Sequence, residues 1–306
     1  MAPKVCVLVS SYNGADYLAG QLDSLVSQTC QNVEIIVRDD GSTDNSPQIL
    51  REYAAKYPHI HVEFGENIGI AGSFMALLSQ AHEHCQYFAF CDQDDVWYPD
   101  KLERALLKHR GTPPGEPALY FSRLEYVGRN LAHLKYSRFL RRRLSFQNAL
   151  VENNASGCTI VLNRSARDMI VSRMPSSRCI MHDQWCYLVV MAFGKVIYDE
   201  QPTIKYRLHG GNDTGAAISF IEGFVRRVRR FTRRRSDAFG VHAQAVEFER
   251  VFGQQLSGDK RAILERFIQS RRSVFARCRY AFHPDVYRQS RLDDVFLRAL
   301  LILGWY

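Results

Sequence analysis

The stretch FAFCDQDDVWYPDK, residues 88–101, decides the expected fold because an apolar strand ends in a group of carboxylates. The strand is followed at once by Asp92, Asp94 and Asp95. In open α/β sheets, ligands bind beyond the carboxyl ends of the strands, and clustered oxygen ligands suit a hard divalent cation such as Mg²⁺ or Mn²⁺. We therefore expect a metal-assisted site here. The alternative is that Asp94 and Asp95 only cap the following helix. Capping needs one carboxylate, whereas this segment has three.

Short runs rich in Val and Ile alternate with helical periodicity through the first hundred residues. Strands are predicted at residues 5–9, 33–37, 61–64 and 87–91, and helices at residues 18–26, from 46 onward and at 72–84. Strands separated by helices of this length form right-handed crossovers. The sequence therefore predicts an α/β fold with a mostly parallel sheet and helices on both faces.

The pattern changes twice further along the chain. Residues 111–117 (GTPPGEP) form a turn-rich break before a second half that runs to about residue 215, with a strand-like region at 196–204. From Ala216 onward, Arg-rich segments show helical periodicity. We expect one continuous domain over residues 1–215, followed by a basic helical region over residues 216–306.

The composition is that of an ordinary globular protein of 306 residues with a net charge of +8. Such a charge indicates an anionic partner: nucleic acid, a phosphorylated small molecule or an anionic membrane. The 8 cysteines are far apart, without a Cys-x-x-Cys pair, so the pattern indicates neither a zinc site nor a redox motif. The N-terminal apolar run is too short for a signal peptide, and no segment approaches the roughly 20 apolar residues that cross a bilayer. We expect a cytoplasmic protein.

A second acidic pair, Asp39 and Asp40, follows the strand predicted at residues 33–37. An acidic pair repels phosphate, so its expected partners are the N–H groups of a base or the hydroxyls of a ribose. Asp-Gly-Ser is also a common turn. The position after a buried strand is what favours the binding interpretation.

Four motifs in this order resemble glycosyltransferase family 2, whose members have the Rossmann-like GT-A fold: VLVSSYNG at 7–14, DDGSTD at 39–44, ENIG at 66–69 and DQDDVW at 92–97. The resemblance implies an inverting, metal-dependent transfer of a sugar from a nucleotide diphosphate. It assigns donor binding to Tyr12, Asn13, Asp39, Asp40, Asn67, Gly69 and Asp92, and Mg²⁺ or Mn²⁺ to Asp92, Asp94 and Asp95. Which two of these three carboxylates touch the metal stays open.

The family's general base is an acidic residue at the start of a helix, often within a Glu-Asp pair. The matching stretch here is Met181-His182-Asp183, with His in place of the first acid. Asp183 is the expected base, which takes the proton of the acceptor hydroxyl as that hydroxyl attacks opposite the leaving diphosphate. His182 ranks second, because imidazole titrates near neutrality. A helix cap is the structural alternative for Asp183.

The segment YRLHGGN, residues 206–212, resembles the family's loop that closes over the diphosphate. Arg207 is expected to pair with phosphate, and His209 to ligate metal or donate to phosphate. A plain solvent loop is the alternative. The segment NNASGCT, residues 153–159, together with CDQDDVW, is similar to the family's rhamnosyltransferases and favours a dTDP-rhamnose donor. UDP-linked donors remain open, and the absence of a Gln-x-x-Arg-Trp signature favours one sugar per encounter.

Two basic stretches lie at residues 138–143 (RFLRRR) and at Arg226 to Arg235. Such runs are usually solvated helix faces. The functional interpretation is an amphipathic surface on anionic lipid, at the inner face of the plasma membrane and near a lipid-linked glycan acceptor of surface polysaccharide synthesis. Nucleic acid ranks lowest because no nucleic-acid motif accompanies the charge. A non-catalytic nucleotide-sugar-binding protein is the further alternative, but three clustered carboxylates would then repel one another to no purpose.

Overall fold

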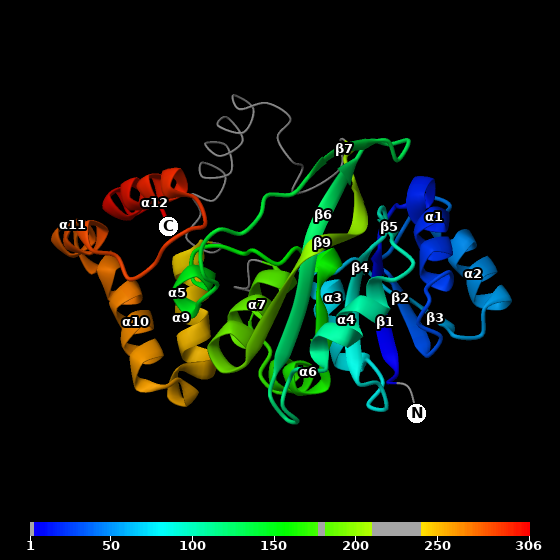
Figure 1. Cartoon of the computed structure of the whole chain (residues 1–306), viewed down its shortest axis with the longest axis horizontal. Coiled ribbons are helices and arrows are strands. Elements are labelled where there is room, and N and C mark those ends of the chain that lie inside the picture. Colours follow the sequence, from blue (N-terminus) through cyan, green and yellow to red (C-terminus); the bar gives the residue numbers. More distant parts are fainter. Residues whose placement is uncertain (1–2, 177–180, 210–239) are drawn as a thin grey trace. The chain divides into compact units, whose positions relative to one another are not determined.

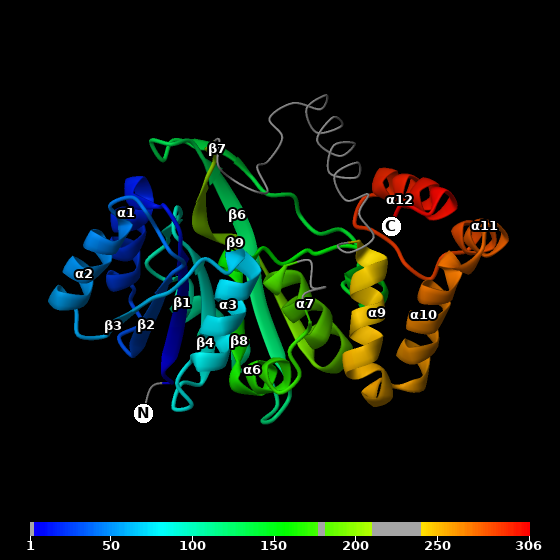
Figure 2. The same cartoon turned by 180° about the vertical axis from the view of Figure 1, so that it is seen from behind.

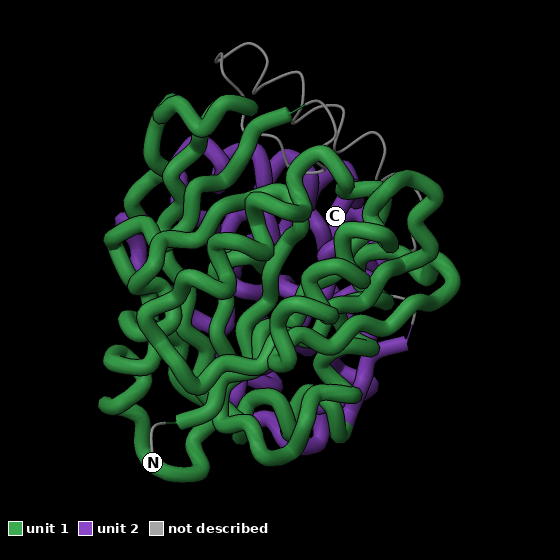
Figure 3. Tube along the Cα trace, turned by 90° about the vertical axis from the view of Figure 1, so that its right-hand side faces the viewer, with its two compact units in different colours: residues 1–139, 155–172, 194–215 green, residues 140–154, 173–193, 216–306 purple. Residues whose placement is uncertain are grey.

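A computed structural model describes residues 3–176, 181–209 and 240–306 (Figure 1). The chain forms two compact units (Figure 3). The first comprises residues 1–139, 155–172 and 194–215, and the second comprises residues 140–154, 173–193 and 216–306. The predicted boundary at residue 215 lies outside the described residues and stays a prediction. The inner segments 140–154 and 173–193 join the helical unit, which no local pattern in the sequence indicated.

The first unit is built on a mixed sheet with the strand order β3-β2-β1-β4-β8-β6-β9-β5, and β7 pairs with β6. The strands are β1 (Val5–Ser11), β2 (Val33–Asp39), β3 (Ile60–Phe64), β4 (Tyr87–Asp92), β5 (Val96–Trp97), β6 (Ala118–Val127), β7 (His133–Tyr136), β8 (Val161–Asn163) and β9 (Lys195–Arg207). Strands β1 to β4 are parallel, as predicted. The other half is mixed, because β8 runs antiparallel to β4 and β6 whereas β9 runs parallel to β6.

Helices cover both faces of this sheet (Figures 1 and 2). They are α1 (Ala15–Val26), α2 (Ser46–Lys56), α3 (Gly69–Gln80), α4 (Lys101–His109) and α6 (Arg164–Val171). Leu18, Leu22 and Leu25 of α1 are buried at helical spacing and share one core with the odd-numbered residues of β1. Helix α3 packs on the opposite face, where Phe74 contacts Phe90 of β4 with ring centroids 5.4 Å apart.

The predicted helix at 72–84 is wrong at both ends, because α3 spans Gly69–Gln80. Gly69 adopts a left-handed φ of 76°, a conformation in which glycine has no steric cost. At the other end, the Arg167 guanidinium donates to the carbonyl oxygens of Leu78, Ser79 and Ala81. These bonds satisfy carbonyls that the end of a helix leaves unpaired, so the chain turns off at Ala81 and residues 81–86 form a loop.

The second unit is helical, which confirms the predicted helical C-terminal region for residues 240–306. Its helices are α5 (Phe146–Ala149), α7 (His182–Phe193), α9 (Val241–Phe252), α10 (Gly258–Gln269), α11 (Val274–Phe282) and α12 (Arg291–Leu303). The core forms where Trp185 of α7 meets Phe248 and Phe252 of α9, with ring centroids 5.8 and 6.2 Å apart. Within the part of the chain that the structure describes, no helix is long and apolar enough to cross a membrane.

Candidate active site

The carboxyl ends of β1, β2 and β4 meet at one edge of the sheet. In the register of these strands, Ser11 is the partner of Asp39 and Ser10 is the partner of Asp92. Asp39 and Asp92 therefore flank the end of β1, about 10 Å apart across two strand spacings. The two acidic motifs that the sequence singled out lie on either side of one strand end.

Asp95 is the most deeply buried of the acidic residues, with none of its surface exposed. Its Oδ1 accepts a hydrogen bond of 3.0 Å from the backbone N–H of Arg207. Its Oδ2 is buried and has no hydrogen-bond partner among the described residues. Burial, reinforced by the neighbouring carboxylates Asp94 and Asp92, raises the pKa of Asp95 well above its ordinary value. An unpaired, buried carboxylate oxygen of this kind fits a cation ligand.

Asp94 contacts the segment that follows β9. Its Oδ2 lies 2.6 Å from His209 Nε2, and its carbonyl oxygen accepts a 2.9 Å hydrogen bond from Arg207 Nε. Tyr17 of α1 packs against both partners: its ring stacks on His209 at 4.9 Å, and the Arg207 guanidinium lies 4.8 Å from its ring centroid. The structure thus brings Arg207 and His209 to the acidic segment.

Two residues that sequence reasoning missed complete this acidic region. Ligand atoms of Asp92, Asp95 and Cys158 all lie within 4.8 Å of one another. Lys101 is fully buried, donates to the Cys158 carbonyl, and places Nζ 3.5 Å from the Trp97 ring centroid. Burial lowers the pKa of Lys101 to about 8. In the sequence Lys101 is only the first residue of a helix, so no signal set it apart; Cys158 at least follows the quoted glycine of NNASGCT.

Gln93 was also missed, although it lies within the quoted acidic motif. Its Oε1 accepts from Tyr12 N at 2.8 Å and from Ser11 Oγ at 3.1 Å, and its Nε2 donates to Tyr12 O at 3.0 Å. Asn13 adopts a φ of 49° and accepts a 2.8 Å bond from Thr43 N at its Oδ1. Gln93 therefore ties β1 to the acidic segment, and Asn13 ties β1 to the loop after β2. The Tyr12 side chain is left 47% exposed.

The adjacent aspartates Asp39 and Asp40 are both buried but differ in what they contact. Asp40 Oδ2 accepts from Gly69 N at 2.9 Å, and both its oxygens lie within reach of Ile68 N, so its carboxylate holds the start of α3. Asp39 uses one oxygen to accept from Ser42 N at 3.0 Å. Its Oδ1 is buried without a hydrogen-bond partner among residues 3–176, 181–209 and 240–306. Of the pair, Asp39 is the one with an oxygen left for a ligand.

Asn67 lies in the exposed loop before α3, and Gly69 is the exposed first residue of that helix. Asn67 Oδ1 accepts a 3.2 Å hydrogen bond from the Gly69 N–H. Both residues lie next to the segment that the Asp40 carboxylate holds. The structure thus brings the ENIG motif to the end of β2.

Asp183 belongs to the second unit, where it is the second residue of α7. Its Oδ1 lies 2.7 Å from the Gln184 backbone N–H. The neighbouring His182 is 3% exposed, and burial lowers the pKa of its ring to about 3. An imidazole with such a pKa accepts protons poorly at neutral pH, which favours Asp183 over His182 as the base.

The predicted basic surface at Arg226 to Arg235 lies outside the described residues, as do Gly210 to Asn212. Within RFLRRR, Arg142 is used inside the second unit. Its Nη1 donates to the Arg288 carbonyl at 2.7 Å and pairs with Asp294. That arginine stabilises the helical unit.

The arrangement defines an α/β protein with a cluster of carboxylates at the carboxyl ends of its parallel strands. Two solved structures share this GT-A architecture. S. aureus TarS 1-349 in complex with UDP-GlcNAc is similar with a TM-score of 0.56 and 16% identity, covering 99% of this chain and 91% of that one. The mannosyltransferase PcManGT from Pyrobaculum calidifontis, in complex with GDP-Man and Mn²⁺, is similar with a TM-score of 0.51 and 16% identity, covering 100% of this chain and 81% of that one.

Sequence comparison gives the family. The model of glycosyl transferase family 2 matches residues 6–169, and the chain belongs to this family. It is a glycosyltransferase, as the four motifs predicted. The dTDP-rhamnosyl transferase RfbG of Shigella flexneri is 28% identical over 228 residues, which are 69% of this chain and 75% of that protein.

Proposed function

We propose that this glycosyltransferase is an inverting, metal-dependent enzyme that transfers rhamnose from dTDP-rhamnose to a hydroxyl of a glycan or lipid-linked glycan in surface polysaccharide synthesis. The observation that carries the proposal is a pair of buried carboxylate oxygens at one edge of the sheet, Asp95 Oδ2 and Asp39 Oδ1, which have no hydrogen-bond partner among the described residues. Burying such oxygens unpaired costs free energy that a bound ligand recovers. Asp95 fits a cation, and Asp39 fits donor hydroxyls or N–H groups.

Each end of the donor has its own set of residues. Tyr12, Asn13 and Asp39 would hold the base and ribose. Asp92, Asp94 and Asp95 would hold Mg²⁺ or Mn²⁺, whose chemistry is to neutralise negative charge on the leaving diphosphate.

The diphosphate would also meet cationic groups of this chain. Arg207 pairs readily with phosphate because guanidinium is a fixed fork of donors. His209, now against Asp94, is placed to donate to phosphate or to join the metal ligands.

Asp183 would then remove the acceptor proton. Its carboxylate takes the proton from the attacking hydroxyl, the new bond forms at the anomeric carbon, and the bond to the diphosphate breaks on the opposite face. Attack and departure on opposite faces invert the anomeric configuration.

The second unit carries a surface that would suit the membrane end of a lipid-linked acceptor. Phe275 and Phe282 of α11 are 78% and 70% exposed, and Trp305 after α12 is 50% exposed. Four exposed arginines lie on these two helices or just before them: Arg272 precedes α11, Arg279 is in α11, and Arg291 and Arg298 are in α12. Apolar side chains beside cationic ones complement an anionic lipid surface. We expect the full chain to sediment with phosphatidylglycerol vesicles and not with phosphatidylcholine vesicles. If the double variant Phe275→Ser, Phe282→Ser sediments with phosphatidylglycerol vesicles as well as the natural chain does, this surface does not bind lipid.

The first experiment is thermal stabilisation of the full chain by dTDP, dTDP-rhamnose, UDP and UDP-sugars, each with Mg²⁺, with Mn²⁺ and with EDTA. A ligand that binds only the folded state raises its stability, by about 2.7 kcal/mol at 100 times its Kd. Metal-dependent stabilisation by dTDP-rhamnose, followed by sugar transfer, is the expected result. Stabilisation by UDP-sugars alone would show that the donor is a UDP-sugar and not dTDP-rhamnose. Stabilisation without turnover on any acceptor would favour the non-catalytic alternative.

A further inference from the structure

The amino ends of the same parallel strands carry a second cluster of titratable side chains. Cys6 of β1 is the register partner of Glu34 of β2, and His61 of β3 is the register partner of Ile36. Directly paired residues share a face of the sheet, and Glu34 and Ile36 share a face because they are two apart. Cys6, Glu34 and His61 therefore all point to the face that α3 covers.

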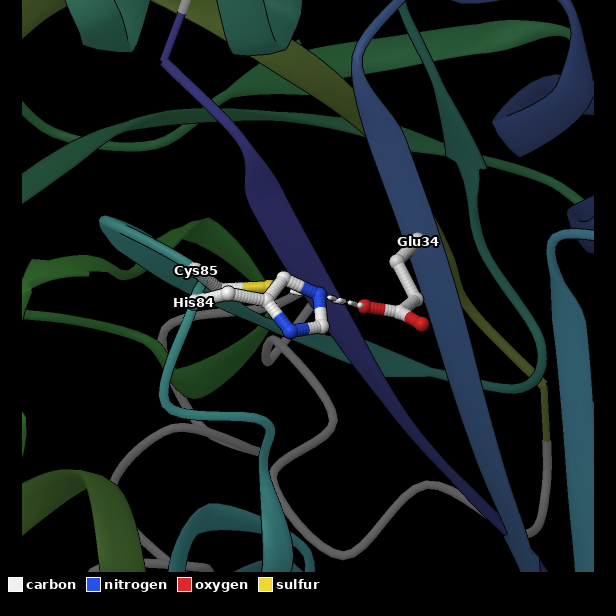
Figure 4. A group of neighbouring side chains, drawn as sticks. All are labelled: Glu34, His84 and Cys85. Carbon is white, nitrogen blue, oxygen red and sulfur yellow. Dashed lines mark hydrogen bonds and ion pairs between the residues drawn. The ribbon is translucent and has the colours of Figure 1, made fainter.

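The loop that follows α3 adds the remaining members of the cluster. His82, His84 and Cys85 lie in the loop of residues 81–86, of which the sequence predicted residues 81–84 as helix. His82 Nδ1 lies 3.0 Å from Glu34 Oε1. His84 Nε2 lies 3.0 Å from Glu34 Oε2, and Cys85 Sγ lies 3.5 Å from the same oxygen (Figure 4). His61 Nε2 lies 3.2 Å from Glu34 Oε1. One carboxylate thus gathers three imidazoles and a thiol.

The surroundings lower the pKa values of both the Glu34 carboxyl and the Cys85 thiol. Burial raises the pKa of Glu34, but hydrogen bonds from His82, His84 and Lys4 outweigh it and lower the pKa to about 2. The Cys6 thiol hydrogen-bonds to Cys85 and lowers the pKa of Cys85. The Glu34 side chain is 8% exposed, whereas those of His82 and His84 are 45% and 54% exposed. The cluster is therefore buried at its carboxylate and open to solvent at its imidazoles.

The chemistry and spacing of these atoms fit one kind of ion. Imidazole nitrogen, thiolate sulfur and carboxylate oxygen are the ligands that Zn²⁺ takes in proteins, at about 2.0–2.3 Å. Around a tetrahedral zinc with such bonds, ligand atoms lie roughly 3.3–3.8 Å apart. Here the Glu34 oxygen lies 3.0 Å from His84 Nε2 and 3.5 Å from Cys85 Sγ, and the three ligand atoms all lie within 4.8 Å of one another. These three side chains would supply three ligands, and His82, whose Nδ1 lies 3.0 Å from the other oxygen of Glu34, would supply the fourth.

Lys4 competes for the same atoms. Its ammonium lies 2.9 Å from His84 Nε2 and 3.3 Å from Glu34 Oε2. The Lys4 side chain is 31% exposed on a flexible stem, so it can withdraw into solvent when another cation enters. A simple ion-pair cluster around Glu34 is the alternative, and it predicts no metal affinity.

We propose that Glu34, His82, His84 and Cys85 form a Zn²⁺ site that clamps the loop after α3 to β2. The site is independent of the proposed donor site, because β2 separates Glu34 from Asp40 by about 20 Å at about 3.3 Å per residue. A zinc ion bound here, and not the end of α3, would then hold residues 81–86 in position.

The test is zinc binding by the full chain after EDTA treatment, measured by calorimetry with zinc alone as the titrant. Excess Mg²⁺ occupies the carboxylates at the other end of the sheet, because Mg²⁺ prefers oxygen ligands. One zinc per chain is expected. Cys85→Ser and His84→Ala should each lower the affinity at least about tenfold, because even an outer partner of a metal site is worth about 10- to 100-fold. Lys4→Ala should bind zinc at least as tightly as the natural chain.

Cobalt provides a readout that a structural role would not move. Co²⁺ in place of zinc should give visible bands of tetrahedral coordination and a near-ultraviolet thiolate band, and Cys85→Ser should lose the latter. His133→Ala is the matched control, since it removes a histidine paired with a glutamate, Glu125, at 2.7 Å elsewhere in the same unit. Unchanged zinc affinity in both Cys85→Ser and His84→Ala, no binding above buffer, or binding lost only in Asp94→Asn would overturn the proposal.

Discussion

The two ends of the parallel strands carry clusters of opposite chemical character. At the carboxyl ends, Asp92, Asp94 and Asp95 offer oxygen atoms, and the buried Oδ2 of Asp95 has no hydrogen-bond partner in the part of the chain that the structure describes. At the amino ends, the single carboxylate of Glu34 is surrounded by imidazoles, a thiol and an ammonium. The pKa of Asp95 is raised and that of Glu34 is lowered to about 2. The first cluster gathers three carboxylates, with His209 beside Asp94, whereas the second has imidazoles and an ammonium around a single carboxylate.

The cluster at the carboxyl ends is therefore expected to be stabilised by a bound ligand, whereas the cluster at the amino ends is expected to be stable without one. Like charges brought together in a buried place cost free energy, which is typical of functional sites. Opposite charges around a carboxylate stabilise the folded state. Oxygen ligands select hard cations, whereas nitrogen and sulfur ligands select zinc and its neighbours. The comparison therefore predicts different ions and different energetic roles for the two ends.

The largest expected effect is at the carboxyl ends. Asp94→Asn or Asp95→Asn should reduce sugar transfer below detection and abolish metal-dependent nucleotide binding, because Lewis-acid stabilisation is worth several kcal/mol. Rates and nucleotide binding are measured with Mg²⁺ and Mn²⁺. Asp100→Asn is the control, since its side chain is 53% exposed and its pair with Arg104 is long at 3.9 Å. Normal turnover in both variants would sink the metal assignment, and zinc binding at the amino ends should be unchanged in either.

A smaller loss is expected at the proposed base. Asp183→Asn should lower transfer by about 10²–10⁴-fold, the usual contribution of a general base, while nucleotide binding stays as in the natural chain. The pairing of lost rate with retained donor affinity distinguishes the base from the donor site. Lost nucleotide binding in this variant would instead give Asp183 a structural role. If the rate is normal, the base lies elsewhere.

Thermal stability should change in opposite directions at the two ends. In the metal-free protein at pH 7, Asp95→Asn should raise Tm because an amide does not ionise, whereas burial and the neighbouring Asp94 and Asp92 oppose the ionisation of the Asp95 carboxyl. Glu34→Gln should lower Tm because it leaves the imidazoles and Lys4 without their carboxylate. Each kcal/mol corresponds to about 2–4 °C for a unit of 150–250 residues. Shifts of the same sign, measured by calorimetry in EDTA, would contradict the contrast between the clusters.

The smallest effects are in the pH dependence of the free energy of unfolding. The lowered pKa of Glu34 gives stability that is present above its ordinary value of 4.5 and is lost as the pH falls through about 2. The raised pKa of Asp95 gives stability that is present at or below its ordinary value of 3.8 and is lost as the pH rises through the raised value. Urea unfolding across pH should show Glu34→Gln approaching the natural chain as the pH falls. The free energy of unfolding of Asp95→Asn should increase relative to that of the natural chain as the pH rises. If the curves of both variants against pH run parallel to that of the natural chain, both pKa assignments are wrong.

The sequence predicted the parallel half well because each of its strands has its own local signal. The apolar runs at residues 5–9 and 33–37 became β1 and β2, since buried parallel strands are continuously apolar. The acidic positions after β2 and β4 followed from the same runs. The end of α3 was missed because it depends on Arg167, which is 89 residues from Leu78.

The sequence predicted where the candidate site lies, but not which of its residues hold the fold and which have atoms left for a ligand. Adjacent Asp39 and Asp40 have the same side chain, yet Asp40 holds α3, whereas one buried oxygen of Asp39 has no hydrogen-bond partner among the described residues. Lys101 carried no signal because its burial depends on Cys158, 57 residues away. The scattered cysteines indicated no zinc site, because the spacing rules look for ligands close in sequence.

The sequence by itself determined the family, the parallel half of the sheet and the positions of its acidic strand ends, because each is encoded in a short contiguous motif. Only the tertiary structure decided which carboxylate oxygens are left unpaired and which residues surround Glu34. The physical reason is that burial and hydrogen bonding arise between segments distant in the chain: Glu34 and His84 are 50 residues apart in sequence and 3.0 Å apart in space.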